Sequence, residues 1–193
     1  MRCHRRGLTL MELLLAVSAS AVIALAGTTV LTALTYAAEE QRDLRSVVGK
    51  SLAVGARVGA EIREAHAVLA VGNGFVVLWR GDADDDAQPS LAELVRIEAV
   101  EADQTLKAYG IADGVADVVY DLAVTDFATE TENRIDGGSM AGLNWSRDVA
   151  RFEVALDDVD AQEARLVSYR VTFTAGTLSE VYASAACLRD GGL

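Results

Sequence analysis

Oxygen-bearing side chains recur at regular spacing in the acidic segment between residues 82 and 93. In a twelve-residue frame they occupy positions 1, 3, 5, 7, 9 and 12, which are Asp82, Asp84, Asp86, Gln88, Ser90 and Glu93. This is the ligand spacing of an EF-hand calcium loop, because calcium is held by about six to eight hard oxygen atoms. Ala87 replaces the usual turn glycine, and no helix is expected before the loop. The segment predicts a calcium site at a sheet edge, with a solvated acidic turn as the alternative.

Glu12 is the one charged residue in the apolar run from Leu8 to Ala38. A run of this length can cross a bilayer as a helix, for which roughly 20 residues are needed. A carboxylate inside lipid is costly, so Glu12 is a functional candidate by default. The alternative is a side chain that snorkels to the membrane surface, because Glu12 lies about one turn from the start of the run.

The residues around Glu12 follow a defined order. Two arginines precede Gly7, and the segment Arg5–Leu13 reads RRGLTLMEL. It resembles the N-terminal signal of type IV prepilins and type II secretion pseudoprepilins, in which a short basic leader ends in Gly and Glu is the fifth residue after it. Leu8 stands where that family more commonly has Phe. The resemblance rests on these residues and on the apolar run that follows them.

The resemblance implies a role for three residues. In that family a membrane enzyme, the prepilin peptidase, cuts after the Gly and the new amino terminus is methylated, which assigns cleavage to Gly7 and methylation to Leu8. Gly suits the cut because a residue without a side chain can lie extended in a protease cleft. Glu12 would pair with the α-amino group of a neighbouring subunit, since two charges inside lipid must find each other.

The resemblance further implies a non-enzymatic fibre subunit of a type IV pilus or type II secretion pseudopilus. Its partners would be other pilin or pseudopilin subunits, the lipid of the inner membrane, an inner-membrane assembly platform and a cytoplasmic ATPase. Major type IV pilins commonly pair two C-terminal cysteines, whereas this chain has Cys187 alone in that region. A minor subunit is therefore expected.

Two alternatives for the apolar run stay open. The run is twice the length of the apolar region of a secretory signal, about 7–15 residues, yet Ala19-Ser20-Ala21 offers an A-x-A cleavage site. It also suits an uncleaved single-pass anchor for an extracytoplasmic binding or sensory domain. In each case the basic N-terminus is expected in the cytoplasm and the bulk of the chain in the periplasm, because positive flanks stay inside.

Composition excludes several classes of function. The net charge is −12, and loss of the leader's three arginines would take it to −15. Contact with nucleic acid is not expected, because that affinity comes from Lys and Arg on phosphates. Cys3 lies in the expected leader, so no disulfide can form within the mature chain. Because His66 is the one histidine of the mature chain, a Ser-His-Asp or Cys-His site is not expected either.

The periodicity of apolar residues predicts a helix that continues beyond the membrane, followed by strands. Leu44, Val48, Leu52, Val58 and Ile62 recur at helical spacing up to Ala65, and Gly55 and Gly59 are expected where the sheet packs closely on this helix. Gly72-Asn73-Gly74 predicts a hairpin turn. Strands are expected at Ala67–Val71, Phe75–Arg80, Leu94–Val100, Thr105–Tyr109, Val115–Phe127, Val149–Leu156, Arg165–Thr174 and Leu178–Ala183, and an exposed irregular segment at Thr129–Arg147.

These expectations give an α+β fold with a long N-terminal helix, half of it transmembrane, before a mostly antiparallel β-sheet domain. The chain divides into a leader (1–7), a transmembrane and assembly helix (8–38), an amphipathic continuation of the helix (39–65) and a sheet-rich domain (66–193). This is the pilin-like arrangement that the resemblance implies.

Overall fold

The computed structural model describes residues 10–82, 86–176 and 178–189, without the side chains of residues 37–44 and 175. The chain forms two compact units, Met1–Arg45 and Ser46–Leu193. Helix α1 (Leu10–Glu64) supplies the described part of the first unit and the start of the second. The remaining elements are β1 (Ala67–Gly72), β2 (Phe75–Trp79), β3 (Leu94–Val100), β4 (Thr105–Ile111), α2 (Phe127–Asp136), β5 (Met140–Arg147), β6 (Val149–Leu156), β7 (Leu166–Ala175) and β8 (Leu178–Cys187), with short 3-10 turns at Leu91–Glu93 and Glu101–Asp103.

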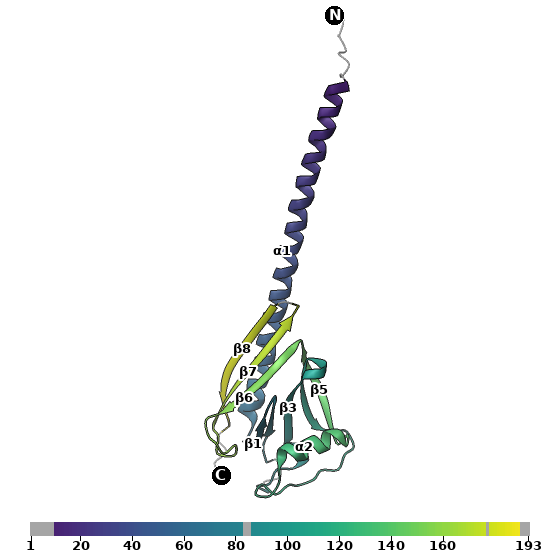
Figure 1. The fold of residues 1–193 in the computed structure, drawn as a ribbon. Coiled ribbons are helices and arrows are strands. Elements are labelled where there is room, and N and C mark those ends of the chain that lie inside the picture. The colour runs from purple at the N-terminus through teal and green to yellow at the C-terminus, as the bar shows by residue number, and fades with distance from the viewer. Residues whose placement is uncertain (1–9, 83–85, 177, 190–193) are drawn as a thin grey trace, which may run out of the picture. The chain divides into compact units, whose positions relative to one another are not determined.

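The strands of the second unit form two antiparallel sheets (Figure 1). The first has the order β1-β2-β3-β4-β5 and the second the order β6-β7-β8, so neighbours in each sheet are also neighbours in sequence. The turn between β1 and β2 contains Asn73 and Gly74, and Gly74 has φ of 85°, a left-handed conformation that glycine adopts without strain. The hairpin predicted there is confirmed.

The five-stranded sheet lies between two apolar clusters. On one face its residues, such as Val76 and Ile97, pack with the C-terminal part of α1 and with the inner face of the three-stranded sheet. On the other face Val77 and Trp79 pack under α2 and the segment that precedes it. Burial of these side chains contributes about 1.5–3 kcal/mol for each large one.

Arg96 on β3 connects α2 to the sheet. Its side chain is buried, with 3% of the residue exposed. Its Nε donates to Oε2 of Glu98 at 2.8 Å, and Nη1 donates to the Ala128 carbonyl and to Oγ1 of Thr131, both at 3.0 Å. The guanidinium also lies 4.1 Å from the ring centroid of Phe75. A buried charge is tolerated when its donors are satisfied in this way.

The structure confirms the long helix and the α+β class, and it corrects two of the expected segments. Residues 115–126 do not form a strand: they cover the sheet as an irregular segment with one isolated bridge, between Ser90 and Val119. Thr129–Arg147 is not an irregular segment, since it contains most of α2 and all of β5. The other expected strands are present, and β4 and β8 extend further than expected, to Ile111 and Cys187.

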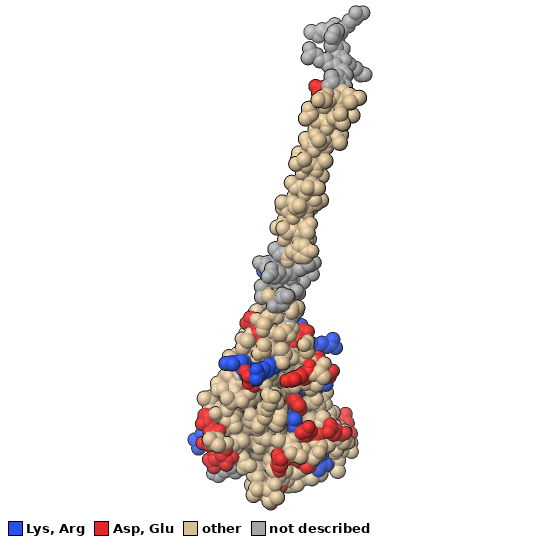
Figure 2. All heavy atoms as spheres, viewed as in Figure 1, with Lys and Arg blue, Asp and Glu red and all other residues tan. Residues whose placement is uncertain are grey.

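Charged side chains cover the second unit, whereas the described N-terminal part of α1 is nearly free of them (Figure 2). The second unit therefore has a surface suited to water. The N-terminal part of α1 instead suits lipid or another protein surface.

Candidate functional site

The N-terminal part of α1 is long and apolar enough to span a membrane. The stretch Leu10–Tyr36 contains 27 residues, and none of its side chains is buried within the chain. A spanning helix needs about 20 residues. This finding is consistent with a single-pass membrane anchor.

The serine and threonine hydroxyls of this stretch are satisfied within the helix. The hydroxyls of its serines and threonines donate hydrogen bonds to backbone carbonyls one turn earlier: Ser18, Ser20, Thr28, Thr29, Thr32 and Thr35, over 2.7–3.0 Å. An unpaired hydroxyl costs several kcal/mol in hydrocarbon. The helix is therefore compatible with lipid in spite of these hydroxyl groups.

Glu12 lies in the first turn of α1, and its residue is exposed. An acid at this position interacts favourably with the positive end of the helix dipole. Gly7 and Leu8, the expected cleavage and methylation positions, lie outside the described residues. The pairing of Glu12 with an amino group of another subunit stays a prediction.

A second apolar surface lies on α1 within the second unit. The helix buries one face against the sheets, through Val54, Val58 and Ile62. The opposite face is exposed and apolar over about two turns; we call it the outward stripe, and it consists of Val48, Gly49, Leu52, Ala53 and Ala56. A helix face in water normally carries polar side chains. The outward stripe therefore has the composition of a contact surface.

The structure revises the apolar stripe expected from the sequence. Val58 and Ile62 face the core, but Val48 and Leu52 lie on the exposed side. The core face is completed by Val47 and Val54, which sequence periodicity alone does not select. The two faces are not separable from the sequence because apolar residues surround most of this part of the helix.

Gly55 lies on the sheet side of α1, as expected. A Cβ atom there would lie 2.1 Å from Cε1 of Tyr182, and the Tyr169 hydroxyl donates a hydrogen bond to the Gly55 carbonyl at 2.7 Å. At Gly59 a Cβ atom would lie 2.8 Å from the same Tyr169 hydroxyl oxygen. The absence of side chains at both positions lets the three-stranded sheet approach the helix.

The acidic loop uses its described carboxylates in its own fold. Both oxygens of Asp82 accept backbone amides, from Asp86 at 3.0 Å and Ala87 at 2.7 Å. The amide of Gln88 donates to Oδ1 of Asp86 at 2.8 Å. Ala87 has φ of 58°, so the chain makes here the left-handed turn for which a calcium loop usually uses glycine.

Glu93, the expected last calcium ligand, is directed into the protein. Its Oε2 accepts hydrogen bonds from Nε1 of Trp79 at 3.0 Å and from the amide of Ser90 at 3.1 Å, and the residues Glu93 and Ser90 are buried. Asp84 lies outside the described residues. Across the described part of the chain, no group of three or more His, Cys, Asp or Glu side chains is arranged to hold a metal ion. A calcium site at this loop stays a prediction.

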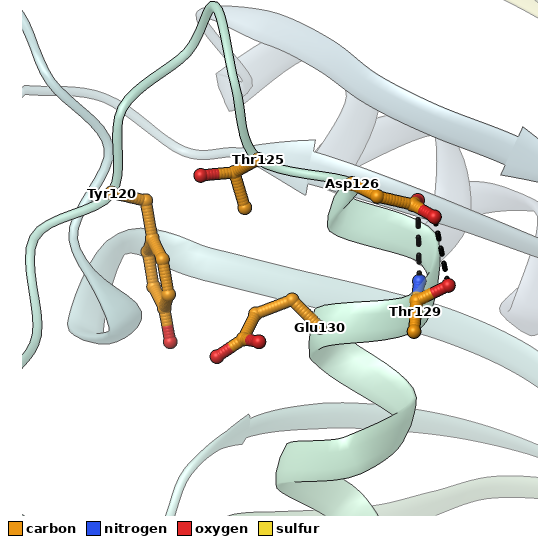
Figure 3. Close-up of a pocket in the computed structure, with 5 residues that line it drawn as sticks. All are labelled: Tyr120, Thr125, Asp126, Thr129 and Glu130. Atoms are coloured by element: carbon orange, nitrogen blue, oxygen red, sulfur yellow. Dashed lines mark hydrogen bonds between the residues drawn. The ribbon is translucent and has the colours of Figure 1, made fainter.

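A pocket of about 420 Å³ opens at the N-terminal end of α2 (Figure 3). Asp126 caps the helix, since its carboxylate accepts the amides of Ala128 and Thr129 and the Thr129 hydroxyl. The hydroxyl and amide of Thr129 hold the pKa of Asp126 below its usual value. The polar groups on this side of the pocket thus stabilise the start of α2.

The opposite wall of the pocket contains Tyr120, which is 7% exposed. Its hydroxyl makes no hydrogen bond to a described residue, and its charged neighbours are Arg134 and Glu130. Burial raises the pKa of this phenol. Nε of Arg134 already donates to Oε1 of Glu130 at 2.8 Å. Among the described residues, the Tyr120 hydroxyl therefore has no hydrogen-bond partner. The Glu130 carboxylate is paired with Arg134 of the same helix.

His66 and Cys187, the remaining chemically reactive residues of the expected mature chain, lie apart from these features. The His66 ring packs edge-on against Trp79, with ring centroids 4.6 Å apart. Cys187 is exposed at the end of β8 and is a free thiol. His66 and Cys187 therefore do not form a pair of base and nucleophile in contact.

Comparison of the chain with protein-family models, with curated proteins and with solved structures found no match.

Proposed function

We propose that this chain is a fibre subunit of the type IV pilin or pseudopilin kind, inserted in the inner membrane and processed by the prepilin peptidase at Gly7. The basic N-terminus would lie in the cytoplasm and the second unit in the periplasm. The proposal rests on the motif Arg5–Leu13 together with the exposed apolar surfaces of α1. It assigns no catalytic activity to the chain.

The outward stripe is the observation that carries the proposal. An anchored monomer needs apolar exposure only where its helix meets lipid, but the stripe lies within the sheet-bearing unit. Its small residues, Gly49, Ala53 and Ala56, permit close approach of another helix. Side-by-side packing of α1 from several copies would cover the stripe, as the fibre requires.

Glu12 would set the position of each subunit in this packing. Cleavage after Gly7 would create a positively charged α-amino group on Leu8. This group of a neighbouring copy would be the partner for Glu12 inside the bilayer. Removal of one partner from a buried ion pair costs roughly 3–5 kcal/mol, because the other charge is left without a partner. Loss of the Glu12 carboxylate is therefore expected to reduce assembly without unfolding the second unit.

The N-terminus of the protein isolated from its native membrane tests the proposal. Mass spectrometry should find a methylated Leu8, and a Gly7→Val substitution should leave the leader attached. A retained Met1 or Arg2 would instead indicate the single-pass anchored binding or sensory domain, and an N-terminus near Val22 would indicate a secretory signal. Either result would refute the fibre subunit.

A second experiment tests the outward stripe. Leu52→Lys, at a residue that is 58% exposed, should prevent incorporation into sheared fibres while the second unit stays folded. The matched control is Val181→Lys, because Val181 is 51% exposed and belongs to strand β8 instead of helix α1. Equal incorporation of both variants would show that the stripe is not a contact surface.

A further inference from the structure

A groove runs between α1 and the exposed end of the five-stranded sheet. We call it the Trp145 groove: its lining includes Ala108, Gly110 and Ala141, which we call its floor, then Leu143 and Trp145, and the charged residues Arg57, Glu61 and Arg80. It has a volume of about 190 Å³. The three floor residues have small side chains or none.

The groove combines apolar and charged residues and is incompletely covered. Leu143 is 58% exposed, and Trp145 is only partly buried. The guanidinium carbon of Arg57 lies 4.6 Å from the centroid of the Trp145 ring. Glu61, one turn further along α1, is held by Arg80 through two oxygens at 2.8–3.0 Å. No described carboxylate forms an ion pair with Arg57. An occupant of the groove should therefore combine an aliphatic side chain with an acid.

The connection between β6 and β7 has this combination. Val159 is fully exposed and is flanked by Asp158 and Asp160. The loop is held in shape by its own acids, since Oδ1 of Asp158 accepts the amide of Asp160 at 3.0 Å and Oδ1 of Asp157 accepts the amides of Arg165 and Leu166 at 3.0 Å. The loop thus presents one aliphatic side chain between two carboxylates.

The groove is lined by residues of β4 and β5, and Figure 1 shows β5 and the connection between β6 and β7 on opposite sides of the second unit. A single chain therefore cannot bring them together, whereas two copies in the same orientation can. A contact between two different surfaces of like subunits repeats into rings or open filaments. Complementary charge at such a contact selects its register.

We propose that the Trp145 groove receives the Val159 loop of a second copy of this chain, with Val159 on the alanine and glycine floor and the flanking aspartates at Arg57. The proposal rests on the proposed function, because only a fibre subunit needs a repeating contact of this kind. It names a lateral contact between the sheet-bearing units, in addition to the packing of their helices.

Cysteine crosslinking in the native membrane tests the contact. Two full-length variants are made in a Cys3→Ser, Cys187→Ser background: one carries Ala141→Cys and the other Val159→Cys. Co-expression should give a disulfide-linked heterodimer after mild oxidation, and each variant alone should give at least tenfold less dimer. Dimers of either single variant at the same level would overturn the proposal, and so would a crosslink of the Ala141→Cys variant to a different protein.

Charge reversal provides the specificity control. Arg57→Glu should reduce the crosslink at least tenfold, and Asp160→Arg on the partner should restore it. The matched control is Arg63→Glu, on the same helix but outside the groove, which should leave the crosslink unchanged. Loss in both variants would refute a specific role for Arg57.

The N-terminal mass of the same samples separates the two proposals. A mature N-terminus at Leu8 without the crosslink would refute the groove contact and leave the fibre function standing. A crosslink on chains that keep their leader would support the groove contact and refute the proposed processing.

Discussion

Replacement of Gly55 by alanine measures how closely α1 packs on the three-stranded sheet. The new Cβ would lie 2.1 Å from Cε1 and 2.3 Å from Cζ of Tyr182, far inside contact distance. The Tyr182 ring is partly buried against the core cluster, and the centroid of the Tyr169 ring is 6.2 Å from its own. The helix or the ring must therefore shift. Overpacking of this kind costs about 1–3 kcal/mol.

Gly49→Ala is the matched control for this substitution. It lies on the same helix in the same unit, and its Cβ would meet no atom within 4 Å. Alanine is favoured over glycine within a helix by about 1 kcal/mol at each position. Because this gain is common to both variants, the difference between them isolates the contact with Tyr182. We expect Gly55→Ala to be about 1–3 kcal/mol less stable than Gly49→Ala.

Urea unfolding of the full-length chain in detergent micelles gives the free energy of unfolding. Tryptophan fluorescence reports on the second unit, since Trp79 is buried in its core. In a Tyr182→Ala background the two alanine variants should become equally stable, because the obstructing ring is gone. If Gly55→Ala and Gly49→Ala were equally stable in the otherwise unaltered protein, the close packing would be refuted. It would also be refuted if the difference in their free energies of unfolding stayed the same in the Tyr182→Ala background.

Four further predictions concern the second unit. Arg96→Met should lower the free energy of unfolding by about 1–3 kcal/mol, because it removes the hydrogen bonds to the Ala128 carbonyl, Thr131 and the partly exposed Glu98; urea unfolding measures this, and a loss below about 1 kcal/mol would contradict it. Tyr120→Phe should leave stability unchanged or raise it by up to about 1 kcal/mol, since the hydroxyl it removes has no hydrogen bond to a described residue; a clear loss in the same urea measurement would reveal a partner. The pKa of Asp126 is lower in the folded state than in the unfolded state, so its contribution is present above the unfolded value of about 3.9 and is lost as pH falls through the folded value; Asp126→Asn should flatten the acid limb of a stability-against-pH curve. Calcium at the loop 82–93 would raise the melting temperature reversibly by mass action, and a melting temperature unaffected by calcium and by EDTA would exclude the site.

The sequence predicts best the strands with a regular alternation of side chains and the end of the long helix. Strands β3 and β6 have the expected bounds, because their residues alternate between a core and a second surface. The C-terminal end of α1 agrees with the expected end within one residue, where the chain turns into the first hairpin. In these segments local periodicity and tertiary packing favour the same structure.

The two segments whose expected secondary structure is wrong fall between residues 115 and 147, where tertiary packing decides the outcome. Val115, Val118 and Leu122 are apolar because they cover the second face of the five-stranded sheet, and they do so without forming a strand. Helix α2 has a polar composition, yet its boundaries are marked by Asp126, the N-cap, and Gly137, at the C-cap. Both capping residues can be read from the sequence. The segment is nevertheless expected to be irregular, because it has no periodic apolar residues that would indicate a helix.

Strand β5 cannot be recognised from its own residues. It includes Gly142 and Asn144, which are poor strand formers, and most of its residues are exposed. Its structure comes from the ladder with β4, where Tyr109 pairs with Gly142 and its ring occupies the space that a Cβ would need. Pairing with β4 therefore determines the structure of β5, although its residues have a weak preference for strands. The same strand contributes Leu143 and Trp145 to the Trp145 groove.

The position of the outward stripe favours a fibre subunit over a tethered domain on physical grounds. Leu10–Tyr36 already provides more length than the roughly 30 Å hydrocarbon core requires. The stripe lies outside that stretch, because Val48 follows Tyr36 by twelve residues and belongs to the second unit. The sheets do not cover the stripe either, because they occupy the opposite face of α1. An apolar helix face outside the membrane-spanning stretch and outside the core suits a covering protein surface, and a row of small residues suits a second helix. Assembly through α1 would provide that cover, and entry of the Leu52→Lys chain into fibres as readily as the unaltered chain would contradict it.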